Sequence, residues 1–281
     1  MSEPQTLLSE LAFPEGPRYR DGRLYFSDMH SKEVVAVDLE GRRETLCRVE
    51  GDPSGLGFMP DGRMLIVSMV DRRVLRRSVD GQLVEHADLA ELAECHCNDM
   101  VVDAHGRAYV GNFGYDLHGG GEHRKASLIL VEADGAPRVV ADGLSFPNGS
   151  AITDDGRTLI VGETMAARLT AFDIGDDGSL SGRRLWAQLQ GAVPDGICLD
   201  AKGGIWVASP IGHAVLRVLE GGEVTDRVAI DNEAFACMLG GPERRHLFIC
   251  TAATSNPAEA VASRSGRIEV LEVDVPGAGL P

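Results

Sequence analysis

The fold is decided by a pattern that recurs along the chain and is clearest in residues 147–161, PNGSAITDDGRTLIV. A Pro-Asn-Gly tripeptide opens an apolar segment, Asp155-Gly156 supplies a turn, and residues 158–161 form a second apolar segment, as in a hairpin of short strands. The same order recurs in residues 14–26, 53–67, 97–110, 194–207 and 235–249. Five of the six turns carry a glycine, at spacings of 40, 44, 50 and 47 residues: Gly22, Gly62, Gly106, Gly156 and Gly203. A repeat of about 40 to 50 residues is typical of propellers and arrays.

Further apolar or β-branched segments fill the intervals and predict about four strands per repeat. Examples are residues 33–38, 127–132, 169–173, 215–219 and 267–273. Six small sheets cannot each bury both faces alone, so they must pack side by side around an axis. We therefore predict an all-β fold, a six-bladed β-propeller with about four antiparallel strands per blade, in which residues 1–281 form a single domain.

Two segments outside this pattern complete the fold prediction. Residues 6–13 form a spare apolar strand before the first repeat, which we expect to complete the final blade and close the ring, removing an open sheet edge. Residues 87–94 are the best candidate for a helix, placed in a connection between strands.

Charge and composition exclude several classes of function. The 281 residues include 27 Lys and Arg against 43 Asp and Glu, giving a net charge of −16, which disfavours binding to nucleic acid or anionic lipid. No apolar run approaches the roughly 20 residues of a membrane helix, and the N-terminus shows no secretory signal. We expect a cytoplasmic protein with no nucleic-acid or membrane partner. In that compartment most of its six cysteines should be reduced. Cys95-His96-Cys97 has no second Cys/His pair at zinc-like spacing, so we do not expect a zinc site there.

Alignment of the repeats identifies candidate functional residues at one equivalent position. The equivalent residues are Glu15, Ser54, Asn98, Asn148, Asp195 and Ala236, of which four are carboxylates or amides. An equivalent position at the start of the innermost strands lies on one ring near the central channel. Pro-Asn-Gly and Pro-Asp-Gly are also ordinary turn tripeptides, but glutamate is no turn former and Glu15 occupies the same position.

Four converging oxygen donors would repel one another without a cation. The absence of Cys and His from this repeat position favours a hard cation such as calcium, magnesium or manganese. Three or four protein oxygens are fewer than calcium prefers, which leaves room for water or substrate and suggests an open, catalytic site.

The motifs in combination are similar to those of a known family. Pro14-Glu15-Gly16-Pro17, Asn98-Asp99, Phe146-Pro147-Asn148-Gly149 and Pro194-Asp195-Gly196 resemble the regucalcin (senescence marker protein) and gluconolactonase family of six-bladed propellers over essentially the whole chain. The resemblance implies one divalent metal ion (Ca, Mg, Mn, Zn or Fe(II)) bound by Glu15, Asn148 and Asp195, with Asn98 as a further ligand or substrate contact. It also implies hydrolysis of sugar lactones, with Asp195 activating water.

The sequence departs from the family beside this site. Family members carry an arginine two residues before the asparagine that aligns with Asn98, whereas this chain has His96. His96 either still donates a hydrogen bond to substrate, or indicates a smaller, less hydroxylated or acidic lactone. The glycine-rich insert of residues 114–125 predicts a mobile loop on the channel face or a disordered surface hairpin. Asn112 and, within the insert, Tyr115 and His118 are candidate substrate contacts.

We therefore expect a metal-dependent lactonase, a carboxylic ester hydrolase that opens a small, sugar-derived lactone in carbohydrate metabolism. Its partner would be that lactone. The alternatives are a noncatalytic propeller that binds calcium or other proteins, and a related metal-dependent hydrolase of other esters or organophosphates. No Gly-x-Ser-x-Gly elbow or nucleotide-binding loop supports covalent or nucleotide chemistry.

Overall fold

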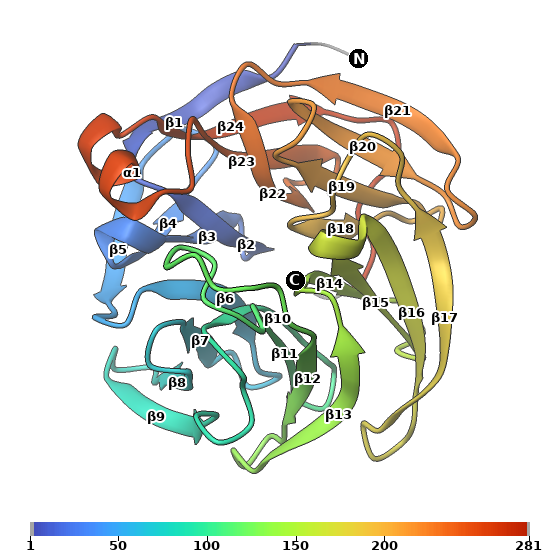
Figure 1. The fold of residues 1–281 in the computed structure, drawn as a ribbon. Coiled ribbons are helices and arrows are strands. Elements are labelled where there is room, and N and C mark those ends of the chain that lie inside the picture. The colour runs from blue at the N-terminus through green and yellow to red at the C-terminus, as the bar shows by residue number, and fades with distance from the viewer. Residues whose placement is uncertain (1–2, 280–281) are drawn as a thin grey trace.

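The computed structural model describes residues 3–279 and arranges them as a ring of six four-stranded antiparallel sheets (Figure 1). The predicted six-bladed propeller is confirmed. The innermost strands are β2 (Pro14–Arg20), β6 (Pro53–Phe58), β10 (Cys97–Val102), β14 (Pro147–Ile152), β18 (Ile197–Leu199) and β22 (Glu233–Gly240). The second strands are β3 (Arg23–Asp28), β7 (Met64–Ser68), β11 (Ala108–Asn112), β15 (Thr158–Glu163), β19 (Ile205–Ser209) and β23 (His246–Ala252).

The third and fourth strands lie farther from the axis. The third strands are β4 (Glu33–Val37), β8 (Arg73–Arg77), β12 (Ala126–Val131), β16 (Arg168–Ile174), β20 (Ala214–Val218) and β24 (Gly266–Glu272). The outermost strands are β5 (Arg43–Arg48), β9 (Leu83–Asp88), β13 (Pro137–Leu144), β17 (Leu180–Gln188), β21 (Val224–Ala229) and β1 (Gln5–Leu11).

The ring is closed by the N-terminal strand, as predicted. β1 pairs with β24 from Gln5 opposite Val270 to Leu11 opposite Gly266, so the first strand of the chain is the outer strand of the last blade. The Leu11 side chain is fully buried in the cluster between the last and first blades. Closure therefore buries apolar surface as well as pairing a sheet edge.

The repeat glycines have the conformation that their turns require. Gly22, Gly62, Gly106, Gly156 and Gly203 all have φ between +70° and +87°, in the left-handed region that glycine adopts without steric cost. Each joins the first and second strands of its blade, so the sequence spacing of the glycines reports the spacing of the blades.

The helix prediction for residues 87–94 was wrong. Residues 83–88 belong to β9 and a turn follows, with Leu89 and Ala93 buried between neighbouring blades. The α-helix of the described residues is α1 (Pro257–Ser263), and two 3-10 turns, η1 (Met29–Ser31) and η2 (Thr164–Ala166), follow β3 and β15. Asn256 caps α1 by accepting hydrogen bonds from the backbone N–H groups of Ala258 and Glu259 at 3.1 and 3.2 Å.

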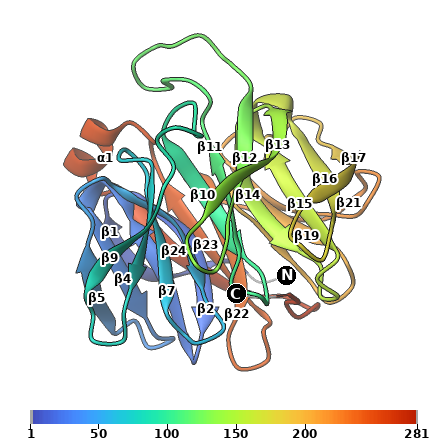
Figure 2. The same ribbon diagram turned by 90° about the horizontal axis from the view of Figure 1, so that it is seen from below.

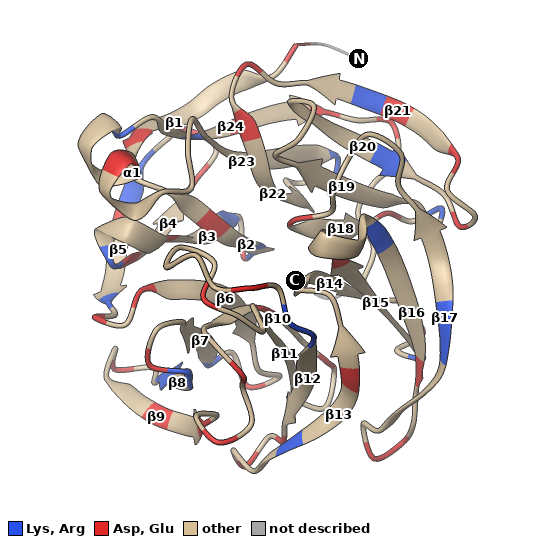
Figure 3. Cartoon of the chain, in the orientation of Figure 1, with Lys and Arg blue, Asp and Glu red and all other residues tan. Residues whose placement is uncertain are grey.

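Two surface features bear on function. Charged residues of both signs occur all round the ring rather than on one blade (Figure 3). The loop between β11 and β12 rises above one face of the ring (Figure 2). Within residues 3–279, no helix has the length and apolar character needed to cross a membrane.

Candidate active site

Four of the repeated tripeptides form bulges at the start of the innermost strands, whereas Pro194-Asp195-Gly196 lies just before β18, whose pairing is regular. Regular pairing shifts between Cys97 and Met100 in β10 and between Pro147 and Ser150 in β14. The same shift occurs at residues 15–18 of β2 and residues 53–56 of β6. A β-bulge bends its strand and redirects a side chain, so the motifs serve to aim the candidate donors rather than to reverse the chain.

The glycine that follows a donor allows neighbouring strands to approach closely at the axis. A Cβ on Gly149 would lie 2.6 Å from the carbonyl oxygen of Asp195, and one on Gly196 would lie 2.5 Å from the Cβ of Ala236. Instead, the Gly149 N–H donates a hydrogen bond to the Asp195 carbonyl at 3.2 Å. Glycine at these positions thus brings Asn148 and Asp195, from two different blades, side by side.

The four predicted oxygen donors line one cavity of about 190 Å³. Glu15, Asn98 and Asn148 are buried, and Asp195 is partly exposed to the cavity. They come from the first, third, fourth and fifth blades, so the ring brings together residues separated by as many as 180 positions, from 15 to 195.

Asn148 links the donors to the wall of the cavity. Its Nδ2 donates hydrogen bonds to Asp195 Oδ1 at 2.6 Å and to Thr164 Oγ1 at 3.2 Å. The Thr164 hydroxyl in turn donates to the Pro194 carbonyl at 2.7 Å. Because the amide nitrogen is used in this way, the Asn148 Oδ1 atom is left available to a ligand in the cavity.

The carboxyl groups of Glu15 and Asp195 stand in an environment that disfavours negative charge. Burial raises the pKa of Glu15 well above its ordinary value, and the nearby Asp195 carboxylate raises it further. Burial also raises the pKa of Asp195, against the opposing effect of the Asn148 hydrogen bond. The negative charge of Asp99 adds to both shifts.

Asp99 itself is paired beneath the site. Arg18 Nη2 contacts Asp99 Oδ1 at 3.0 Å and also donates to the Met100 carbonyl, and both charged side chains are buried. The Arg18 guanidinium therefore compensates Asp99 but leaves Glu15 and Asp195 without a cationic hydrogen-bond partner among the described residues.

The donor set fits a divalent cation. Two carboxyl groups of raised pKa share the cavity with two amides, and the buried Nδ2 atom of Asn98 has no hydrogen-bond partner among the described residues. An unpaired buried amide is costly, and a ligand or a reoriented amide facing a cation would satisfy it. Within residues 3–279 no group of three or more His, Cys, Asp and Glu side chains is placed to hold a metal, so any ion here depends on amide oxygens as well.

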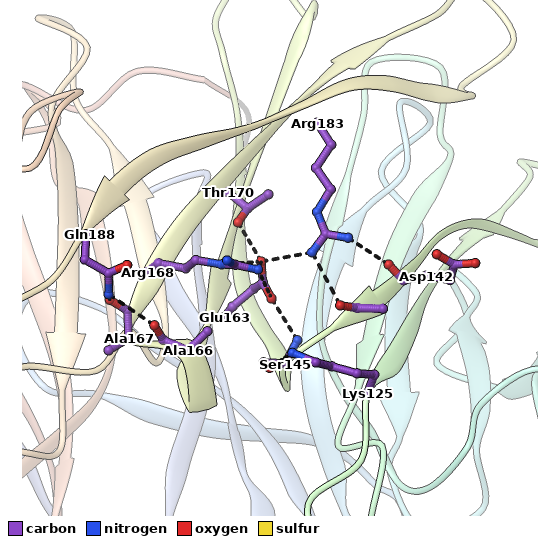
Figure 4. A network of polar contacts seen from close by, with 11 residues as sticks. Lys125, Asp142, Ser145, Glu163, Ala166, Ala167, Arg168, Thr170, Arg183 and Gln188 are labelled. Atoms are coloured by element: carbon purple, nitrogen blue, oxygen red, sulfur yellow. Dashed lines mark hydrogen bonds and ion pairs between the residues drawn. The ribbon is translucent and has the colours of Figure 1, made fainter.

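A buried carboxylate holds the fourth blade in place beside Asn148. Glu163 ends β15 and accepts hydrogen bonds from the Ser145 N–H at 2.8 Å and the Thr170 hydroxyl at 2.6 Å. Arg168 donates to both Glu163 oxygens at 2.9 and 3.0 Å, and Arg183 approaches at 3.4 Å (Figure 4). Burial raises the pKa of Glu163, but these hydrogen bonds outweigh burial, so its pKa lies below the ordinary value. The network ties Ser145, which lies three residues before Asn148, to Glu163, which ends β15 directly before Thr164.

The predicted substrate contacts are only partly brought together. His118, on the β11–β12 loop, lines the cavity. His96 is half-buried with its ring 6.1 Å from that of Phe113, and Tyr115 lies edge-on to Phe146 at 6.2 Å; neither is among the lining residues. Asn112 is fully buried, where its side chain bonds the Ser127 carbonyl and the Gly114 N–H, both at 2.9 Å. Its hydrogen-bonding capacity is thus used within its own blade.

Sequence reasoning missed an apolar collar around the donors. We use this name for six cavity-lining residues: Phe13, Met29, Met69, Phe113, Phe146 and Phe235. A repeat signal could have found several of them. Phe13 and Phe146 each stand two residues before a donor, while Met29, Met69 and Phe113 each directly follow the second strand of a blade. His30 also lines the cavity.

A match to a protein-family model shows to which family the chain belongs. A model of the family described as SMP-30/gluconolactonase/LRE-like region matches residues 13–253. The chain belongs to this family. The matched span contains all four predicted oxygen donors, from Glu15 to Asp195.

Two curated relatives and one solved structure illustrate the range of the SMP-30/gluconolactonase family. The 6-deoxy-6-sulfogluconolactonase of Pseudomonas putida is 29% identical over 93% of this chain and 91% of its own length. The pentonolactonase XacC of Haloferax volcanii is 28% identical over 85% of this chain and 81% of its own length. Regucalcin from Agrobacterium tumefaciens, described as a calcium-binding protein, has a TM-score of 0.83 at 22% identity, covering 100% of this chain and 96% of that chain. At that identity the solved structure supports the fold alone.

Proposed function

We propose that this protein is a divalent-metal-dependent hydrolase that opens a small lactone. The observation that carries the proposal is the convergence of Glu15, Asn98, Asn148 and Asp195, from four blades, on one cavity. Two carboxyl groups of raised pKa, Glu15 buried and Asp195 partly exposed to the cavity, lie beside two amides, an unfavourable arrangement that a cation would compensate.

The named relatives support the reaction class. Both curated lactonases align over more than four-fifths of their own length, so the alignment spans most of each protein. The substrates in their names are sugar-derived lactones, and both names describe the opening of a cyclic ester.

The residues that would hold the ion are Glu15, Asn148 and Asp195, with Asn98 as a further ligand or a substrate contact. When bound, a divalent ion supplies positive charge that polarises the lactone carbonyl and stabilises the negative charge that develops on its oxygen. Its charge would also counter the burial that raises the pKa of both Glu15 and Asp195, and the repulsion by Asp195 that raises the pKa of Glu15 further.

Asp195 is the candidate base. Asn148 holds one of its carboxylate oxygens at 2.6 Å, which fixes the orientation of the group and leaves the other oxygen to accept a proton from water. The water oxygen forms a bond to the lactone carbonyl carbon, and the bond from that carbon to the ring oxygen breaks. The proton taken by Asp195 passes to the departing ring oxygen, so the product is a hydroxy acid and Asp195 is regenerated.

The test is a pair of charge-neutralising variants with a matched control. Asp195→Asn and Glu15→Gln should lower kcat/KM for lactone hydrolysis at least a hundredfold while circular dichroism shows an intact fold. Asp134→Asn makes the same chemical change in an exposed turn, where Asp134 accepts a hydrogen bond from the Ala136 N–H at 3.1 Å, and should leave activity unchanged. Full activity in both site variants would overturn the assignment of the site.

A further inference from the structure

We propose that the cavity takes a lactone whose ring carries an apolar substituent, alkyl or aryl, in place of the hydroxyl groups of a sugar lactone. This inference rests on the proposed function and concerns the part of the substrate that faces away from the donors.

One repeat position builds much of the wall. The residue directly after the second strand lines the cavity in five blades: Met29, Met69, Phe113, Thr164 and Pro210. Four of these five side chains cannot form a strong hydrogen bond. The donors occupy one repeat position of the innermost strands, and this second position surrounds them with apolar side chains.

Two aromatic pairs extend the apolar wall. Phe113 and Phe146 stack with ring centroids 4.6 Å apart and an interplanar angle of 17°. Phe13 and Phe235 also lie 4.6 Å apart, edge to face at 62°. Each pair joins adjacent blades, and all four rings are at least 94% buried, which gives the wall a fixed shape that an apolar group can pack against.

Little hydrogen-bonding capacity remains inside the collar. The Thr164 hydroxyl already donates to the Pro194 carbonyl and accepts from Asn148. Outside the donor set His30 is the exception, because its side chain is 3% exposed and neither ring nitrogen has a hydrogen-bond partner among the described residues, although Nδ1 lies 3.6 Å from Asp52 Oδ2. The His30 ring stacks on Phe13 at 5.2 Å and offers one polar contact.

Of the other polar lining residues, His118 is exposed and Glu233 and Ser255 are half-buried, so all three keep contact with solvent. A polyhydroxylated lactone would bring several hydroxyl groups against the collar, where they would lose their water without gaining partners. A lactone with one apolar substituent would instead bury that substituent against the collar, so that both apolar surfaces lose their contact with water. His96 lies outside the cavity lining and adds no polar contact there.

The first experiment compares three six-membered lactones on the metal-loaded protein: unsubstituted δ-valerolactone, δ-decalactone with its alkyl chain, and glucono-δ-lactone. After subtraction of spontaneous hydrolysis, we expect kcat/KM for δ-decalactone to exceed that for glucono-δ-lactone at least tenfold. Equal or faster hydrolysis of glucono-δ-lactone would overturn the inference and leave the proposed function standing. Hydrolysis of none of the three would overturn the proposed function.

Binding of unreactive analogues tests the preference for an apolar substituent separately from lactone hydrolysis. Six-membered lactams resist hydrolysis, and the lactam with a five-carbon alkyl chain should bind at least tenfold more tightly than the unsubstituted lactam in calorimetry. Equal affinities would overturn the inference whatever the catalytic result.

A variant pair tests the collar itself. Met69→Gln introduces a polar side chain of similar length, whereas Met69→Leu keeps the position apolar. The preference for δ-decalactone over δ-valerolactone should fall at least fivefold in Met69→Gln and be retained in Met69→Leu. A preference that is the same in both variants would overturn the collar as its origin.

Discussion

The buried ion pair beneath the site gives a prediction whose size follows from the structure. Arg18 and Asp99 have side-chain exposures of 4% and 7%, with 3.0 Å between Arg18 Nη2 and Asp99 Oδ1. Arg18 also donates to the Pro17 carbonyl at 2.7 Å, and Asp99 Oδ1 accepts from the Met100 N–H at 2.8 Å. The pair therefore joins the first and third blades at the axis.

Arg18→Met should remove the positive charge while keeping an unbranched side chain in place. Asp99 would then be a buried, unpaired carboxylate close to Glu15 and Asp195. Breaking a buried pair in this way costs about 3–5 kcal/mol, so we expect a loss of that size in the free energy of unfolding. Adding Asp99→Asn removes the uncompensated charge but keeps an acceptor for the Met100 N–H, and should restore about 1–2 kcal/mol.

The assay is urea unfolding followed by tryptophan fluorescence, since Trp186 and Trp206 are both buried. The control is Arg42→Met, which breaks an exposed contact with Asp38 at 2.6 Å and should cost less than about 1 kcal/mol because Arg42 is 76% exposed. The reasoning is refuted if Arg18→Met costs no more than this control, or if the double variant is less stable than Arg18→Met alone.

Three further predictions concern single side chains. Asn98→Ala should change stability by less than about 1 kcal/mol, because the Asn98 amide nitrogen has no partner among the described residues, but should lower kcat/KM at least tenfold; a loss of stability without loss of activity would contradict this. The lowered pKa of Glu163 means that its contribution to stability is complete above the ordinary value of 4.5 and is lost as the pH falls through the lower folded-state value. Urea unfolding from pH 7 to 3 should therefore show a shallower acid loss in Glu163→Gln, and an unchanged slope would count against the network. Leu11→Ala should lower the free energy of unfolding by about 2–5 kcal/mol, since Leu11 is fully buried where β1 closes the ring; a cost below 1 kcal/mol would mean that closure adds little.

The strands of the fold were predictable because each repeat carries its own turn signal. The Asp-Gly turns need a residue with positive φ, and Gly62 and Gly156 show that conformation at φ of 87° and 70°. The closing strand was predictable because residues 6–13 had no partner within the first repeat. The helix prediction failed because the apolar spacing of residues 87–94 arises from the end of β9 and a turn packed between blades, which produces buried positions without a helical repeat.

The donors of the site were predictable from one repeat position, and the collar was not. A tripeptide such as Pro147-Asn148-Gly149 has the composition of a turn, and only the shifted pairing of β14 shows that it is a bulge. In the sequence, Phe113 and Met69 resemble ordinary core residues. Whether the residue after a strand faces the core or the cavity depends on where in the propeller that strand ends. Asn112 is the converse case, because a polar residue near the channel proves to bond within its own blade.

We have proposed that the four convergent donors form a metal-dependent lactone-opening site, and removal and restoration of the metal would test this. Protein treated with chelator and then dialysed should be assayed by proton release on a small lactone panel, with Ca, Mg, Mn, Zn and Fe(II) each restored in turn. The account predicts less than about a hundredth of full activity without metal, recovery with at least one of these ions, and no recovery in Asp195→Asn. Full lactone hydrolysis by the metal-free protein, or hydrolysis that Asp195→Asn leaves unchanged, would contradict it.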